Sequence, residues 1–198
     1  MNITSKKQPF ILRIAFLALF FAMATLASAQ DPYAKMLDLS RPNHHHAALG
    51  RIAGKWNFQD AKRSFVKGTV VRTSIYDGRF YQVQVTGGRL QVPIADGKMK
   101  EDNYQEMQFE GYDNGRQQYV STSINNHIGS DIQMQMGTYD SVSSTFTYTW
   151  ESELLQGEKV KNRRVLKIVD HSHYIEEFFE EDKGTFVKVR ELDYTRAE

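Results

Sequence analysis

The sequence contains no cysteine among its 198 residues. Without cysteine there is no disulfide framework, and there is no thiol that a lipid could modify behind an N-terminal signal. A domain that lacks covalent cross-links has to obtain its stability from a packed core. The absence of cysteine therefore predicts a fold that is stabilised by packing alone.

Long hydrophobic runs are also scarce. The pronounced apolar run, Ile14 to Ala27, is about 14 residues long, too short for a helix to cross about 30 Å of hydrocarbon. Basic residues precede this run and Ala27-Ser28-Ala29 follows it, which is the order typical of a secretory signal peptide. We therefore expect residues 1–29 to be a signal peptide that is cleaved near Ala29. The mature protein would be exported, periplasmic or secreted, with no membrane span.

Neither sign of charge dominates the chain. Removal of residues 1–29 takes away three positive charges and leaves 22 Lys and Arg residues against 24 Asp and Glu residues. Nucleic acids and anionic membrane surfaces are bound by concentrated positive charge, so this balance argues against nucleic acid as a partner. The remaining residues, about 169, are enough for one domain with a sizeable core.

The N-terminal part of the mature chain shows no strand alternation. Residues 30–45 carry Asp31-Pro32 and Arg41-Pro42, and a residue that precedes proline is biased towards extended structure. We therefore expect an extended lead-in over residues 30–45, with room for one short helical turn. A single domain would follow over residues 46–198.

From Trp56 onward, apolar and polar residues alternate with a period of two, which is typical of half-buried strands. Clusters of turn-forming residues separate these segments, which predicts about ten strands joined by hairpins and no long helix. The expected turns are Tyr76-Asp77-Gly78, Gly87-Gly88, Ala95-Asp96-Gly97, Asp113-Asn114-Gly115 and Asp182-Lys183-Gly184.

A run of sequential hairpins determines the expected architecture. Parallel strands would need connections of about a dozen residues or more, so the sheet is expected to be antiparallel and up-and-down. Closing such a sheet removes its exposed edges and produces an all-β barrel. A sandwich of two sheets is the alternative that alternation leaves open. A barrel of this size either fills with side chains or holds one small ligand.

Two strands predict what the interior contains. In Ile132–Met136 the apolar residues alternate with glutamines, so the methionines are expected to point inward and the glutamines outward. In Thr145–Trp150 the aromatic residues are expected inside. Such a lining suits a small, largely apolar ligand, although a filled core explains it equally well. The expected lining residues are Met134, Met136, Tyr148, Trp150 and Phe109.

The histidines give little support for a metal or a cofactor. Three adjacent residues, His44-His45-His46, cannot all face one ion on an extended chain. His171 and His173 share one face of a strand, but their surroundings are typical of a polar turn and no third ligand is evident. The last expected strand, Phe186–Arg196, contains no histidine that could bind haem. We therefore predict neither a metal site nor a cofactor.

The carboxylates are the remaining candidates for catalysis. Glu151 and Glu153 continue the threonine face of their strand and are expected to be solvated. Glu176 and Glu177 face opposite sides, so one of them can point inward, which would be costly without a charged partner and would mark a candidate site. The candidate partners are Arg164 and Arg190. No catalytic residue is assigned, and the enzyme interpretation is the weaker one.

The first strand begins with Gly54-Lys55-Trp56, which resembles the Gly-x-Trp motif that opens the barrels of lipocalins and calycins. In that family an arginine from the last strand lies across the tryptophan, and Arg196 is the matching residue. A guanidinium over an indole gains cation–π attraction while it donates to nearby carbonyls. The resemblance implies that Gly54, Trp56 and Arg196 close the barrel.

An ordered set of motifs extends along most of the mature chain, and this set resembles a family of exported bacterial proteins classed as a domain of unknown function with a calycin-like barrel. The family implies fold and export but no activity. The motifs are His46-x-x-Leu49-x-x-Ile52-Ala53-Gly54-Lys55-Trp56, Gly78-Arg79-Phe80, Phe109-Glu110-Gly111-Tyr112-Asp113-Asn114, Tyr119-Val120, Gly137-x-Tyr139-Asp140 and Tyr194-Thr195-Arg196.

Three functions remain open at this point. The leading hypothesis is a non-catalytic barrel that binds a small, largely apolar ligand. The second is a filled barrel that interacts with envelope proteins through its outer threonines and glutamines. The third is an isomerase or hydrolase that uses an inward carboxylate or histidine.

Overall fold

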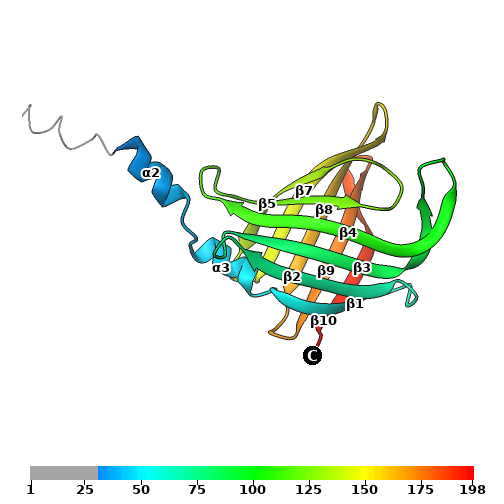
Figure 1. The fold of residues 1–198 in the computed structure, drawn as a ribbon, viewed down its shortest axis with the longest axis horizontal. Helices are drawn as coiled ribbons and strands as arrows, with labels where there is room; N and C mark the ends of the chain where they lie inside the picture. The colour runs from blue at the N-terminus through cyan, green and yellow to red at the C-terminus, as the bar shows by residue number, and fades with distance from the viewer. Residues whose placement is uncertain (1–30) are drawn as a thin grey trace, which may run out of the picture. The chain divides into compact units, whose positions relative to one another are not determined.

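The computed structural model describes residues 31–198 (Figure 1), so the expected signal peptide, residues 1–29, lies outside the described residues. The chain divides into two units, residues 1–41 and 42–198. Within residues 31–198, no helix has the length and apolar character needed to cross a membrane.

The lead-in is helical rather than extended. Helix α2 covers Pro32–Leu39, and helix α3 covers His44–Gly50. Asp31 caps α2 by accepting a hydrogen bond from the backbone N–H of Tyr33, and proline is tolerated in the first turn, where its missing N–H has no helical partner. The prediction of an extended segment is therefore wrong, because Asp-Pro here begins a helix.

Ten antiparallel strands follow α3 and form one closed barrel, visible in Figure 1. Each strand pairs with the next one along the chain, and the last strand pairs with the first. The predicted up-and-down barrel is confirmed and the sandwich is excluded. The strands are β1 (Gly54–Asp60), β2 (Lys67–Ile75), β3 (Phe80–Pro93), β4 (Met99–Asp113), β5 (Gln118–Asn125), β6 (Gln133–Asp140), β7 (Thr145–Leu155), β8 (Glu158–Ile168), β9 (His173–Asp182) and β10 (Thr185–Arg196).

The barrel closes where β1 meets β10, and Trp56 is paired there with Arg196. The guanidinium carbon of Arg196 lies 4.2 Å from the centre of the Trp56 ring. Its Nε donates to the carbonyl of His171 at 2.8 Å and its Nη1 to the carbonyl of Ala53 at 3.0 Å. Gly54 has a φ of +111°, and a Cβ there would lie 2.8 Å from Arg196 Nη1, so a side chain would disturb the contact.

Helix α3 lies at one end of the barrel and covers its apolar core (Figure 1). The indole N–H of Trp56 donates to the carbonyl of Ile52, just after α3, at 2.9 Å. The hydroxyls of Tyr81 and Tyr119 donate to carbonyls inside α3, at 3.4 Å and 3.2 Å. The buried residues at this end include Leu49, Ile52, Trp56, Tyr81, Phe146, Leu166 and Tyr174.

Four of the five expected turns lie between strands, but Gly87-Gly88 does not. Strand β3 continues through this pair, with a shift of register between Thr86 and Arg89. A Cβ on Gly87 would lie 2.9 Å from the Cβ of Tyr104 on the neighbouring strand. The glycine pair is therefore an irregularity inside β3 that allows β4 to approach closely. Besides forming turns, glycine commonly has this role within strands.

The closure contact leads to a stability prediction. Replacing Arg196 by lysine removes the flat cation over Trp56 and the fork of N–H donors that reaches the carbonyls of His171, Ala53 and Arg51. We expect Arg196→Lys to lower the free energy of unfolding by about 1–3 kcal/mol, measured by urea denaturation. The control is Arg116→Lys, where an exposed arginine is paired with Asp113 and little change is expected. Equal midpoints for the two variants would contradict this account of closure.

Candidate functional site

Four ionised side chains are buried together inside the barrel. They come from strands β2, β4, β8 and β9, and none is more than 4 % exposed. Arg72 lies 3.3 Å from Glu110 and 3.4 Å from Glu176, and Arg164 lies 3.4 Å and 3.7 Å from the same two carboxylates. Each arginine thus faces both glutamates, and the formal charges cancel. We call Arg72, Glu110, Arg164 and Glu176 the charge cluster.

Buried tyrosines complete the hydrogen bonding of the charge cluster. Arg72 Nη1 donates to the hydroxyl oxygen of Tyr174 at 2.5 Å, and the Tyr194 hydroxyl donates to Glu176 Oε2 at 2.7 Å. Burial raises the pKa of Tyr174 and of Tyr194, so both hydroxyls keep their protons at neutral pH.

The arginines of the charge cluster remain charged. Burial alone would lower the pKa of Arg164, but the carboxylates of Glu176 and Glu110 raise it. The same balance leaves the pKa of Arg72 well above its ordinary value. The cluster is therefore a set of mutually compensated ions, which the buried environment tolerates only because every charge faces an opposite one.

The structure separates the two adjacent glutamates as the sequence predicts. Glu176 points inward and lies 3.7 Å from Arg164, one of its two candidate partners. Glu177 takes the other face and pairs with Lys188 at 2.9 Å. The second candidate partner, Arg190, is exposed and lies over the ring of Phe178, 4.2 Å from its centre.

A row of uncharged polar groups lies beside the charge cluster, on β5, β6 and β7. Ser121 pairs with Glu110 on one side and with Gln135 on the other. The pairing of β6 with β7 ends at Met136 and Thr149, so Gln135 and Trp150 each lie one residue beyond the last pair, on the inward face. Within residues 31–198, Ser121 Oγ, Gln135 Oε1 and Trp150 Nε1 are buried and have no hydrogen-bond partner. We call Ser121, Gln135 and Trp150 the polar row.

The inner surface changes character along the barrel. On β8 the inward residues pass from Ile168 and Leu166, near α3, to Arg164 and then to Asn162. The surroundings of the polar row are rich in amides and hydroxyls. These neighbours are Gln108, Ser123, Gln133 and Asn162. The interior therefore consists of an apolar core at the end near α3 and a polar region beyond the charge cluster.

The expected ligand-lining residues do not come together. Tyr148 is buried inside the barrel, and Trp150 follows it on the same face. Met134 and Phe109 lie on the outer surface, with 57 % and 46 % of their areas exposed. Met136 shares the outer face of β6 with Met134. The predicted inward orientation of these two methionines is therefore wrong.

Glycine explains the reversal of β6. Gly137 is buried, and a Cβ at this position would lie 2.6 Å from the ring of Tyr148. The bulky ring on β7 thus needs a residue without a side chain opposite it, which turns Gly137 inward. Because strand side chains alternate, Gln135 points inward as well and the methionines point outward.

The histidines are used for local structure. The ring of His45 stacks on Tyr112 at 4.0 Å, and His46 Nδ1 accepts from the backbone N–H of Asn43 at the start of α3. His173 Nε2 lies 3.1 Å from a carboxylate oxygen of Asp193. Within residues 31–198, no group of three or more His, Cys, Asp or Glu side chains is arranged to hold a metal ion.

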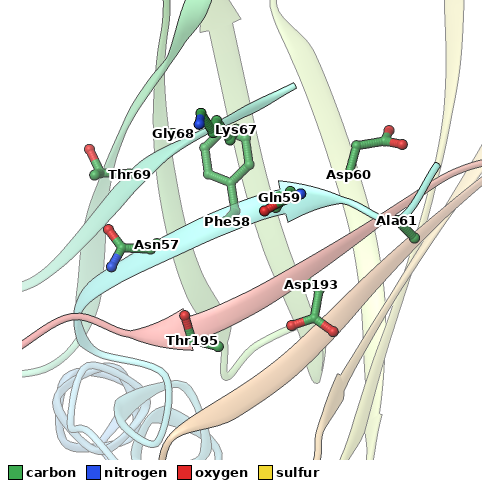
Figure 2. A pocket seen from close by; sticks show the side chains of 10 residues that line it. All are labelled: Asn57, Phe58, Gln59, Asp60, Ala61, Lys67, Gly68, Thr69, Asp193 and Thr195. Carbon is green, nitrogen blue, oxygen red and sulfur yellow. The ribbon is translucent and has the colours of Figure 1, made fainter. Parts of the chain in front are cut away.

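A separate hollow of about 600 Å³ lies over β1, β2 and β10, as Figure 2 shows. Its lining includes Asn57, Gln59 and Thr195, which are exposed. One of the lining residues, Asp60, forms a salt bridge with Arg63 at 2.7 Å. None of the buried polar atoms that lack a partner in the described chain belongs to this lining. We therefore place the candidate site in the barrel interior, at the polar row.

The fold and the closure contact define a class, the closed up-and-down antiparallel β-barrel. The model of the family described as "Protein of unknown function (DUF1579)" matches residues 41–196, which is most of the chain. The protein belongs to this family. No curated protein matches the chain.

The charge cluster leads to a second stability prediction. Glu110→Gln leaves two buried arginines facing one carboxylate, so we expect the free energy of unfolding to fall by about 3–5 kcal/mol in urea denaturation. The matched control is Glu151→Gln, which removes an exposed pair with Lys159 and should cause no measurable change. A Glu110→Gln variant as stable as the control would show that the cluster is not a compensated unit.

Proposed function

We propose that this protein is a non-catalytic binding protein that holds a small molecule inside its barrel, beside the polar row. The observation that carries this proposal is the set of buried, unpartnered atoms on Ser121, Gln135 and Trp150. A buried polar group without a partner costs about 1–3 kcal/mol. A ligand that forms hydrogen bonds with all three would offset this cost, and the adjacent strands present the three groups to one region.

The charge cluster supports binding over catalysis. A general acid or base has to exchange a proton with its substrate. Glu110 and Glu176 are each held by two arginines, and Glu176 also accepts from Tyr194. The oxygens of both carboxylates are thus already engaged by side chains of the barrel, which leaves them poorly placed to reach a substrate. This arrangement supports a binding site more than an isomerase or hydrolase site.

The polar surroundings bear on the kind of ligand. The expectation of a largely apolar ligand depended on methionines that lie on the outer face. Trp150 remains as inward aromatic surface next to amides and hydroxyls, whereas the ring of Tyr148 is covered by Arg164. We propose a ligand that makes hydrogen bonds as well as contacts with the Trp150 ring. The N-terminal order of basic, apolar and small residues supports export as part of the same proposal.

A second candidate function, interaction with another protein, is favoured by one observation. The outer faces of β4, β5 and β6 expose the apolar side chains of Phe109, Ile124 and Met134. Phe109 and Met134 both pair with Thr122, so they flank one position of the sheet. Crosslinking in the source cells, followed by purification, would be expected to recover one specific partner. Recovery of none would contradict this second function.

The binding function is tested by native mass spectrometry of the full chain purified from its own source cells. We expect a bound small molecule in the unaltered protein. Its retention should be about tenfold weaker in Gln135→Leu, because this change removes a buried hydrogen-bonding group at nearly constant size. The control is Gln84→Leu, an outward-facing position on β3, which should retain the molecule.

The binding function would be contradicted if no small molecule were found in any of these samples. If the unaltered protein and both variants carry no small molecule, and extracts of the source cells add none, the barrel is a filled one. The polar row would then be a purely structural feature.

A further inference from the structure

We infer that the ligand of the interior site is a neutral molecule that carries hydroxyl groups, a sugar or another polyol, recognised by Ser121, Gln135 and Trp150. This inference rests on the proposed binding function and adds the chemical class of the ligand. Three features of the site lead to it: the balance of charge, the pattern of donors and acceptors, and the neighbouring aromatic ring.

The first feature is the absence of an excess charge in the charge cluster, in which two arginines face two glutamates. Glu106, further along β4, accepts from the hydroxyl of Tyr104 and from the side-chain amide of Gln108, both at 2.8 Å. A charged ligand held against the charge cluster would lose its hydration without meeting an uncompensated opposite charge there. The site therefore favours a neutral ligand.

The second feature is the complementary chemistry of the unpartnered atoms. Trp150 Nε1 can only donate a hydrogen bond, Gln135 Oε1 can only accept one, and Ser121 Oγ can do both. A carboxylate would satisfy the donor but not the acceptor, and an ammonium group the reverse. A hydroxyl group donates and accepts through the same oxygen. It is the simplest group that matches all three atoms.

A further donor lies next to the polar row. Arg164 Nε is buried and has no hydrogen-bond partner among residues 31–198, although the rest of this guanidinium faces the carboxylates. Four polar atoms in one region exceed what a single hydroxyl can satisfy. A ligand with several hydroxyl groups on neighbouring carbons would reach more of them.

The third feature is the aromatic surface on β7. Trp150 points to the same side of this strand as Phe146 and Tyr148. The Tyr148 ring is already covered by the guanidinium of Arg164, 4.6 Å from its centre, so the half-buried Trp150 provides the aromatic surface for a ligand. A sugar or cyclic polyol has a face of C–H groups that can lie on such a ring while its hydroxyls reach the amides around it. Neither an apolar molecule nor a small ion would use both kinds of surface.

The ligand would enter from the end of the barrel away from α3. Phe146 and Tyr148 are buried, whereas Trp150 and Ser152, further along the same face of β7, are half-buried. On β6, Gln133 is half-buried and Gln135 is buried. Exposure thus rises away from α3 on both strands, so the polar row lies between the charge cluster and the more accessible end.

The experiment exposes the full chain to three mixtures and measures binding by native mass spectrometry. The first mixture contains neutral monosaccharides, disaccharides and polyols, the second the corresponding uronic acids and amino sugars, and the third small apolar molecules such as toluene. We expect binding from the first mixture. Members of the second that differ only by a charge should bind at least about tenfold more weakly, because the charge has no partner.

Two variants test the residues that the inference names. Trp150→Phe keeps an aromatic ring but removes the N–H, and Gln135→Leu removes the acceptor. Each should weaken binding of the neutral molecule by about tenfold, while Gln84→Leu should leave it unchanged. The mixtures decide the ligand class on the unaltered chain even where a variant fails to fold.

The possible outcomes separate this inference from the proposed function. Binding confined to charged or apolar molecules would overturn the polyol assignment while the binding function stands. Binding of sugars that is unaffected by Trp150→Phe and Gln135→Leu would place the site elsewhere and also overturn the inference. A chain that takes up nothing from any mixture, and that carries nothing from its source cells, would overturn the proposed binding function itself.

Discussion

Arg72, Glu110, Arg164 and Glu176 neutralise one another inside the barrel, and the rest of the interior depends on that balance. Each of these groups would be strongly destabilising if it were buried alone. They come from β2, β4, β8 and β9, and three of their four ion pairs connect strands that are not neighbours in the sheet; the pair of Arg164 with Glu176 joins the adjacent strands β8 and β9. The barrel can therefore bury four charges with no net charge among them, and this balance supports the proposal of a neutral ligand.

The charge cluster also separates two regions with different roles. Towards α3 the inward residues are aliphatic and aromatic, and this end provides most of the packing in a protein without cysteine. Beyond the cluster the inward residues carry hydroxyls and amides, and three of their polar atoms lack partners in the described chain. The packed core and the proposed binding site thus lie at opposite ends of one barrel. The inward aromatic residues of β7, from Phe146 to Trp150, extend through both regions.

Local patterns were sufficient for most of the architecture. Alternation, turn residues and the lack of crossover helices predicted the antiparallel up-and-down barrel, and the Gly54-Lys55-Trp56 motif predicted the contact with Arg196. The errors occurred where a signal had two interpretations. Gly87-Gly88 lies inside a strand instead of in a turn, and Asp31-Pro32 begins a helix. Part of the site was also predicted: alternation and the cost of burying a lone charge indicated that one of Glu176 and Glu177 points inward and needs an arginine, Arg164 or Arg190, and the structure selects Glu176 and Arg164.

The sequence by itself determined the strand segments and the need of one inward glutamate for a charged partner, because these follow from the period of a strand, from turn chemistry and from the cost of burying a lone charge. The closure residues followed from the resemblance to lipocalins and calycins. Only the tertiary structure decided which face of β6 is inside. Gln135 points inward because Gly137 has to lie against Tyr148 of β7. The alternation of residues within β6 alone does not indicate this contact between strands. The same holds for Ser121 and Trp150, whose proximity to Gln135 is a matter of register across three strands.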